Sequence, residues 1–209
     1  MASAADPLTW RDRIKNAYMA APADTGNFRV LAGYFAGLAK SAPEAVAHFK
    51  EEAAQSPILA HTLPLICAHV GIQPGDIDLV RGALASGLMK PYWLRQWSAG
   101  GVLAKVPTRI VAPLFDQVFG MGGAAFSIGL ELMGMYVHGR SEVLDELRHQ
   151  LRLAAGFPAQ TFENRGSQMD VHQFHELMGW ILGKGRTDPD AVAIAIDLTK
   201  AHCPCGARR

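Results

Sequence analysis

The stretch Phe119–Val137, "FGMGGAAFSIGLELMGMYV", decides the fold class, because its apolar residues are sorted with the period of a helix. From about Gly123, two adjacent apolar stripes recur at offsets of three and four: Phe126, Leu130, Met133 and Val137 in one, and Ala125, Gly129, Leu132 and Tyr136 in the other. The remaining side holds Ser127, Glu131 and His138. This sorting predicts a heavily buried globular helix with a narrow polar edge. We expect the small residues Gly122, Gly123, Ala124 and Ala125 to let a neighbouring helix approach closely.

Three other interpretations of this stretch fit the residues less well. A membrane span needs about 20 apolar residues, and Glu131 near its middle would cost several kcal/mol. A phosphate-binding loop needs a lysine and a hydroxyl residue after its last glycine, and neither follows Gly123. The sequence "AFSIG" resembles the nucleophile turn of a hydrolase around Ser127, but that turn follows a strand, and the pattern here is helical.

Composition narrows the class of protein. The chain has 209 residues, of which 49% are hydrophobic and 19% charged, enough for one large globular domain or a short array of repeats. A formal net charge of +1 lacks the basic excess that is typical of nucleic-acid-binding proteins. The three cysteines are too sparse for a disulfide framework, Cys67 fits a small core residue, and no apolar segment of signal-peptide length stands near the start. We therefore expect a cytoplasmic protein with no membrane association.

Helix start and stop signals recur at short intervals and predict about ten helices with no sheet. Proline follows a capping residue at Asp6–Pro7, Ser56–Pro57 and Asp188–Pro189, and Ser41 and Glu44 have capping-box spacing. Glycine follows an apolar run, where a left-handed residue can end a helix, at Gly71, Gly87, Gly120, Gly139 and Gly156. No long run alternates with the period of a strand. The sequence therefore predicts an all-α fold.

A repeat is visible in three segments that begin at Ile77, Ile110 and Val143, each about 33 residues after the one before. Helix pairs that recur at such a period are typical of α-solenoids, in which each pair covers the apolar face of the next. Pro64 and Pro113 stand inside predicted helices and should kink or restart them, as is common in curved arrays. We predict a right-handed α-solenoid or bundle of about ten helices in antiparallel pairs.

With this period, these prolines and these glycine ends, the chain resembles a HEAT-like α-helical repeat protein, best over Pro57 to Leu153. The segment Gly87–Val106, "GLMKPYWLRQWSAGGVLAKV", is also similar to helical-repeat tails of large bacterial NTPase or defence proteins. The resemblance implies a partner-sensing region or a small relative of one, and it carries no functional residue over to this chain.

The domain organisation expected is a single all-helical domain over residues 1–209. Residues 156–169 would form a flexible link before the last helix pair, and residues 203–209 a frayed tail. The last predicted helix, "AVAIAIDLTKAH" over residues 191–202, is apolar around much of its circumference and needs cover on more than one side. It predicts a self-association surface for a two-fold homodimer through Val192, Ile196 and Thr199.

The aromatic segment "KPYWLRQW" supplies the candidate partner-binding residues Tyr92, Trp93, Arg95 and Trp97. On an α-helix Trp93 and Trp97 are one turn apart and share a face. Tryptophan, tyrosine and arginine dominate interface hot spots, although these two tryptophans also fit core anchors between repeats. We expect a non-enzymatic protein-binding or scaffolding module that presents a concave surface to a protein partner and needs no cofactor.

Two other functions stay open. In "DVHQFHE", the side chains of His172, His175 and Glu176 could hold zinc or iron in a helical-bundle protein or enzyme, although no second motif completes such a site and a solvated helix face also fits. The other is accessory nucleic-acid binding, against which the near-neutral net charge argues. Its phosphate contacts would be Arg140, Arg148, Arg152, Lys184 and Arg186.

Overall fold

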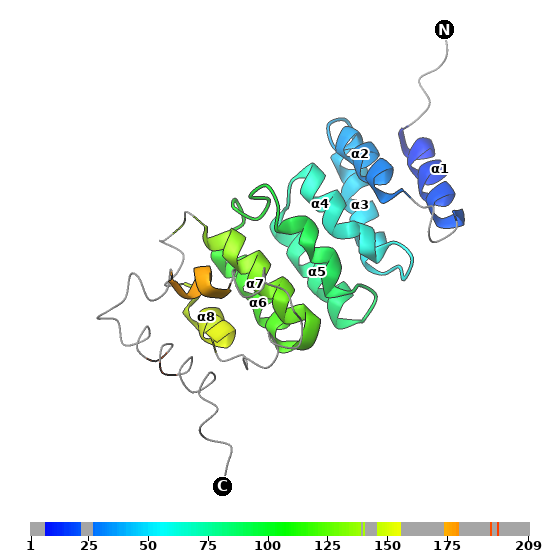
Figure 1. Ribbon diagram of the computed structural model, residues 1–209. Helices are drawn as coiled ribbons and strands as arrows, with labels where there is room; N and C mark the ends of the chain where they lie inside the picture. The colour runs from blue at the N-terminus through cyan, green and yellow to red at the C-terminus, as the bar shows by residue number, and fades with distance from the viewer. Residues whose placement is uncertain are drawn as a thin grey trace. The chain divides into compact units, whose positions relative to one another are not determined.

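The secondary structure is helical throughout the described part of the chain. The computed structural model describes residues 7–21, 27–138, 140, 146–155, 174–179, 193 and 196. These residues form eight α-helices and two 3₁₀-helices, with further helical residues at 174–179, 193 and 196, and none of them lies in a strand (Figure 1). The prediction of an all-α fold is confirmed. No helix among these residues has the length and apolar character needed to cross a membrane.

The chain divides into two compact units between Val102 and Leu103. The first, unit 1, contains α1 (Pro7–Ala20), α2 (Phe28–Leu38), α3 (Pro43–Ala54), η1 (Ala60–Thr62), α4 (Leu63–Val70), α5 (Pro74–Ala85) and η2 (Pro91–Trp97). The second, unit 2, contains α6 (Thr108–Gly120), α7 (Gly123–Val137) and α8 (Arg148–Ala155). The single domain stays a prediction, and the link and tail expected at 156–169 and 203–209 lie outside the described residues.

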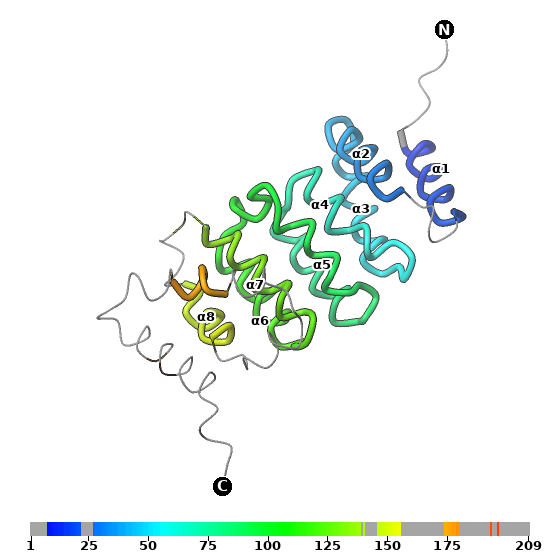
Figure 2. Tube along the Cα trace, viewed as in Figure 1, coloured from blue at the N-terminus to red at the C-terminus, as the bar shows by residue number. Residues whose placement is uncertain are grey.

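Alternate elements of unit 1 pack on one another. Helix α2 packs on α4, α4 packs on η2, and α3 packs on α5, while α1 contacts α2 (Figure 2). The core between α2 and α3 is centred on Phe35 and Phe49, whose stacked rings have centroids 4.0 Å apart. The buried Trp97 attaches η2 to α4: its indole Nε1 donates a 2.7 Å hydrogen bond to the Pro64 carbonyl. Burying the indole with its N–H satisfied lets a large apolar side chain enter the core without a polar penalty.

Unit 2 is built on α7, the helix predicted from the opening stretch. The helix begins at Gly123 as expected, and both apolar stripes are buried. The polar edge is narrower than predicted, since Ser127 is also buried and only 8% exposed. Helix α6 packs on α7 and on α8. The Tyr136 hydroxyl of α7 donates a 2.7 Å hydrogen bond to the Val106 carbonyl, which fixes the segment before α6 against α7.

Of the four small residues at the start of α7 that were expected to let a neighbouring helix approach closely, Gly122 does not have that role. Gly122 and Gly123 have φ of +62° and +52°, so glycine serves there to make the tight turn between α6 and α7. No atom lies near the place that a Cβ on Gly122 would occupy. A close approach occurs further along α7, where a Cβ on Gly129 would stand 2.7 Å from the Phe119 ring.

Several helix boundaries differ from the sequence prediction. Helix α4 begins at Leu63, so Pro64 lies in its first turn, where the missing N–H leaves no bond unmade, whereas Pro113 does lie inside α6. Ser41 does not cap α3: the N-cap is Ala42, and the Ser41 hydroxyl donates to the Leu38 carbonyl at the end of α2. Gly71, with φ of +90°, ends α4 as predicted.

The contact at Gly129 gives a prediction with an internal control. Gly129→Ala should lower the free energy of unfolding by about 1–3 kcal/mol, because the new methyl group collides with the packed Phe119 ring. Gly134→Ala in the same helix meets no atom and should raise it by up to about 1 kcal/mol, because alanine favours helix. Urea unfolding followed by circular dichroism measures both changes. A similar stabilisation by both substitutions would contradict the close approach.

Candidate functional site

An aromatic surface lies on unit 1, formed by Phe28, His61, Tyr92, Trp93 and Arg95. The half-buried Trp93 ring is at its centre, with ring centroids 5.8 Å from Phe28, 5.0 Å from His61 and 5.6 Å from Tyr92. The Arg95 guanidinium lies 5.5 Å from the centre of the Tyr92 ring. Tyr92 is 57% exposed although its ring is held on two sides. The surface therefore presents an ordered aromatic ring to solvent, beside a positive charge.

The structure brings together three of the four residues predicted as a partner site. Tyr92, Trp93 and Arg95 belong to the aromatic surface, but Trp97 is only 1% exposed and belongs to the core. The reason is that η2 is a 3₁₀-helix rather than the α-helix expected. With about three residues per turn, positions four apart are rotated by about 120°, so the two tryptophans no longer share a face. Trp97 anchors the element, and Trp93 reaches the surface.

His61 is a member of the aromatic surface that the sequence prediction missed. Its Nε2 lies 2.7 Å from the Tyr18 hydroxyl of α1, and its ring also makes a hydrogen bond with the backbone of Ile58. Partial burial lowers the pKa of His61, and the Ile58 hydrogen bond offsets this only in part. The neutral imidazole fits both contacts, with the Tyr18 hydroxyl donating to Nε2. His61 thus links α1 to the ring of Trp93.

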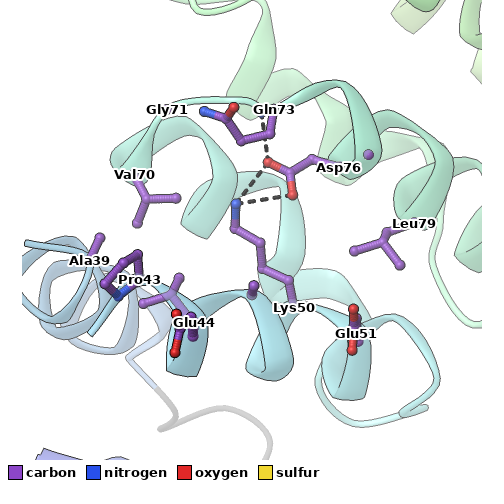
Figure 3. Close-up of a pocket in the computed structure, with 13 residues that line it drawn as sticks. Ala39, Pro43, Glu44, Lys50, Glu51, Val70, Gly71, Gln73, Asp76 and Leu79 are labelled. Carbon is purple, nitrogen blue, oxygen red and sulfur yellow. Dashed lines mark hydrogen bonds and ion pairs between the residues drawn. The ribbon is translucent and has the colours of Figure 1, made fainter.

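A second feature of unit 1 is an open cleft beside α3, which we call the α3 cleft. Its volume is about 610 Å³, within the range of about 300–1,000 Å³ that is usual for ligand sites (Figure 3). Its apolar lining residues are Ala39, Pro43, Val46, Ala47, Val70 and Leu79. Its polar lining side chains are Glu44, Lys50, Glu51, Gln73 and Asp76. Helix α3 contributes half of the apolar residues and three of the five polar ones, and residues of α4, α5 and the end of α2 complete the cleft.

A buried ion pair lies in the wall of this cleft. The Lys50 amine of α3 donates hydrogen bonds of 3.0 and 2.8 Å to the two carboxylate oxygens of Asp76 on α5, and the side chains are only 7% and 6% exposed (Figure 3). One of the same oxygens accepts a 2.9 Å bond from the Gln73 backbone N–H, which completes a capping box at the start of α5. The carboxylate also lies at the positive end of the helix dipole. Asp76 therefore joins two helices and begins one of them.

Cys67 of α4 lies close to the ion pair of Lys50 and Asp76. Its thiol is free and fully buried, as its apolar context predicts. Burial raises the pKa of the thiol, and the nearby Asp76 carboxylate raises it further. Because the nucleophilic form of cysteine is the thiolate, both effects disfavour reaction of this thiol in the folded protein.

The other candidate residues fall partly outside the described chain. His175 and Glu176 are exposed in the helical segment 174–179, His172 lies outside the described residues, and no three possible metal ligands are grouped among the residues that are described. Of the expected dimer surface, Ile196 is 47% exposed, while Val192 and Thr199 are not described. Both interpretations remain predictions.

The arginines proposed for nucleic-acid contact are only partly assembled. Arg148 and Arg152 are exposed one turn apart on α8, and the Arg140 guanidinium lies 4.5 Å from the centre of the Tyr136 ring. Lys184 and Arg186 lie outside the described residues. These placements do not test nucleic-acid binding.

Comparison of the chain with protein-family models, with curated proteins and with solved structures finds no match. The resemblance to HEAT-like repeats stays a prediction. The protein is all-α, and its two candidate binding features, the aromatic surface and the α3 cleft, both lie on unit 1.

The buried ion pair predicts a large effect of removing one partner. Lys50→Met should lower the free energy of unfolding by about 3–5 kcal/mol, because it leaves the Asp76 carboxylate buried without a counter-charge. The matched control is Lys15→Met, which breaks the more exposed 2.8 Å pair between Lys15 and Glu52 and should cost at most about 1 kcal/mol. Guanidinium unfolding measures both. Equal costs would show that the Lys50 pair is solvated.

The lowered pKa of His61 predicts acid sensitivity of unit 1. Below about pH 6.5 His61 is protonated more readily in the unfolded chain than in the folded one, because its pKa is lowered by folding. Stability that is present at neutral pH is therefore lost as the pH falls through the lowered pKa of the folded state. The melting temperature at pH 5 relative to pH 7.5 should fall less for His61→Phe than for the wild type. His48→Gln, which changes an exposed histidine, should behave as the wild type. An unchanged pH dependence in His61→Phe would refute the assignment.

Proposed function

We propose that this chain is a protein-binding or scaffolding module of helical-repeat type, without catalytic activity, and that the aromatic surface of unit 1 receives its partner. The observation that carries the proposal is the Tyr92 ring, which is 57% exposed yet held against Trp93 and Arg95. A large side chain that is already ordered loses little conformational entropy when a partner covers it. An aromatic centre with an arginine beside it is the composition of interface hot spots.

The packing of unit 1 supports the repeat character of the module. The elements α2, α4 and η2 pack in chain order, and their first residues, Phe28, Leu63 and Pro91, are 35 and 28 positions apart. Helices α3 and α5, which alternate with these elements along the chain, pack on each other. Such alternation is how a helical repeat covers the apolar face of each pair with the next. On this proposal, successive repeats hold η2 in place for binding.

Trp97 and Trp93 have complementary roles in this proposal. Trp97 fixes η2 to α4 through the bond to the Pro64 carbonyl, and Trp93 contacts the Tyr92 ring edge to face. The partner would therefore meet a rigid surface, and its affinity would depend on the ring of Tyr92 more than on the arginine at the rim.

Affinity capture from a lysate of the source organism tests the proposal. Immobilised wild-type protein should retain a partner that Tyr92→Ala retains at least about tenfold less, because a hot-spot truncation costs at least about 2 kcal/mol. The control is Met121→Ala, which removes a similarly exposed apolar side chain from unit 2. Circular dichroism confirms that both variants fold. Retention of the same proteins by wild type and Tyr92→Ala, or of none by either, would count against this function.

A further inference from the structure

The charges of the α3 cleft are not balanced. Among the described residues that line it, the only basic side chain is Lys50, and its amine is held by both oxygens of Asp76. Glu44 and Glu51 are exposed at the cleft and add two carboxylates to this neutral pair. The Glu51 carboxylate lies 4.0 Å from the exposed ring of His48, which does not line the cleft. The mouth of the cleft is therefore negative while its wall is neutral.

The two carboxylates lie on one face of α3 with an apolar gap between them. Glu44 and Glu51 are seven residues apart, about 10.5 Å along the helix axis, and Figure 3 shows them in line along α3. Ala47 lies between them on the same face, and its small side chain leaves the cleft open. Val70 and Leu79 line the cleft from α4 and α5 (Figure 3). The cleft thus offers an apolar space flanked by two negative charges.

We infer that the α3 cleft is a docking site for a segment of a protein partner, a basic amphipathic helix that inserts apolar side chains between two lysines or arginines. Basic residues at positions i and i+7 of such a helix are about 10.5 Å apart, which matches the separation of Glu44 and Glu51. Apolar residues at i+3 and i+4 lie between them on the same face and would enter the space above Ala47. This is recognition of a helix in a groove, with the contacts supplied by α3, α4 and α5.

Charge decides the choice of occupant. An acidic segment would bring like charges together at Glu44 and Glu51, and the Lys50 amine has already given two hydrogen bonds to Asp76. A purely apolar segment would fill the space but leave both carboxylates covered without a counter-charge. A basic amphipathic helix satisfies both the apolar lining and the two carboxylates.

A synthetic peptide tests the inference with the full chain. The probe is an alanine-rich helix of ~15 residues with lysine at i and i+7 and leucine at i+3 and i+4. Titration followed by amide chemical shifts should move resonances of α3, Val70 and Leu79. The same peptide with glutamate in place of lysine, or serine in place of leucine, should bind at least about fivefold more weakly. Equal binding of the glutamate peptide, or shifts elsewhere on the protein, would overturn the inference.

Variants of the protein separate the charge from the shape of the cleft. Replacing both carboxylates in Glu44→Gln/Glu51→Gln should weaken binding of the lysine peptide about fivefold to tenfold, as expected for two partly exposed ion pairs. The matched control Asp12→Asn/Asp78→Asn removes the same charge outside the cleft and should leave binding unchanged. Ala47→Phe fills the cleft without changing charge and should weaken binding at least about tenfold.

The outcome does not depend on the aromatic surface. Tyr92→Ala should bind the lysine peptide as the wild type does, because Tyr92 does not line the cleft. Loss of a captured partner in Tyr92→Ala with unchanged peptide binding would leave both proposals standing. Peptide binding that Ala47→Phe and Glu44→Gln/Glu51→Gln both leave unaffected would refute the α3 cleft alone.

Discussion

The ion pair between Lys50 and Asp76 is the constraint on which the structure of unit 1 depends most. Asp76 accepts bonds from an amine 26 residues earlier in the chain and from a backbone N–H three residues earlier, so one carboxylate fixes both the packing of α3 on α5 and the start of α5. The same contacts neutralise the wall of the α3 cleft. The negative charge of Asp76 also raises the pKa of the Cys67 thiol. A local capping signal and a long-range contact therefore converge on one residue.

The sequence was most informative where a pattern is local and repeated. The apolar stripes of α7 predicted its start at Gly123 and the burial of both stripes, because a helix sorts residues by position alone. Single capping signals were less reliable: the N-cap of α3 is Ala42, and the Ser41 hydroxyl instead donates back to the Leu38 carbonyl at the end of α2. The close approach at Gly129 could not be found in the sequence, since it depends on where the Phe119 ring of another helix lies.

The candidate sites likewise divide into residues that a local pattern could predict and contacts that depend on how distant helices pack. Tyr92, Trp93 and Arg95 could be proposed from composition because aromatic and arginine residues favour interfaces, but Trp97 could not be separated from them without knowing that η2 has three residues per turn. The contacts of His61 and the contact between Lys50 and Asp76 carried no local signal, although the capping box of Gln73 and Asp76 is itself local. These contacts join residues that are distant in the chain, 43 positions apart for Tyr18 and His61 and 26 positions apart for Lys50 and Asp76. Such contacts are set by how helices pack, which single-sequence patterns do not encode.

Stability alone does not explain why a charged pair occupies the wall of the cleft. Two apolar residues of similar volume are often as stabilising as a buried ion pair, because the desolvation of both charges offsets their attraction. An apolar pair would, however, leave the Gln73 N–H without its acceptor and the start of α5 less defined. The ion pair instead provides a neutral wall whose polar atoms are already satisfied by one another. The charge of a ligand in the cleft would then interact mainly with the Glu44 and Glu51 carboxylates at its mouth.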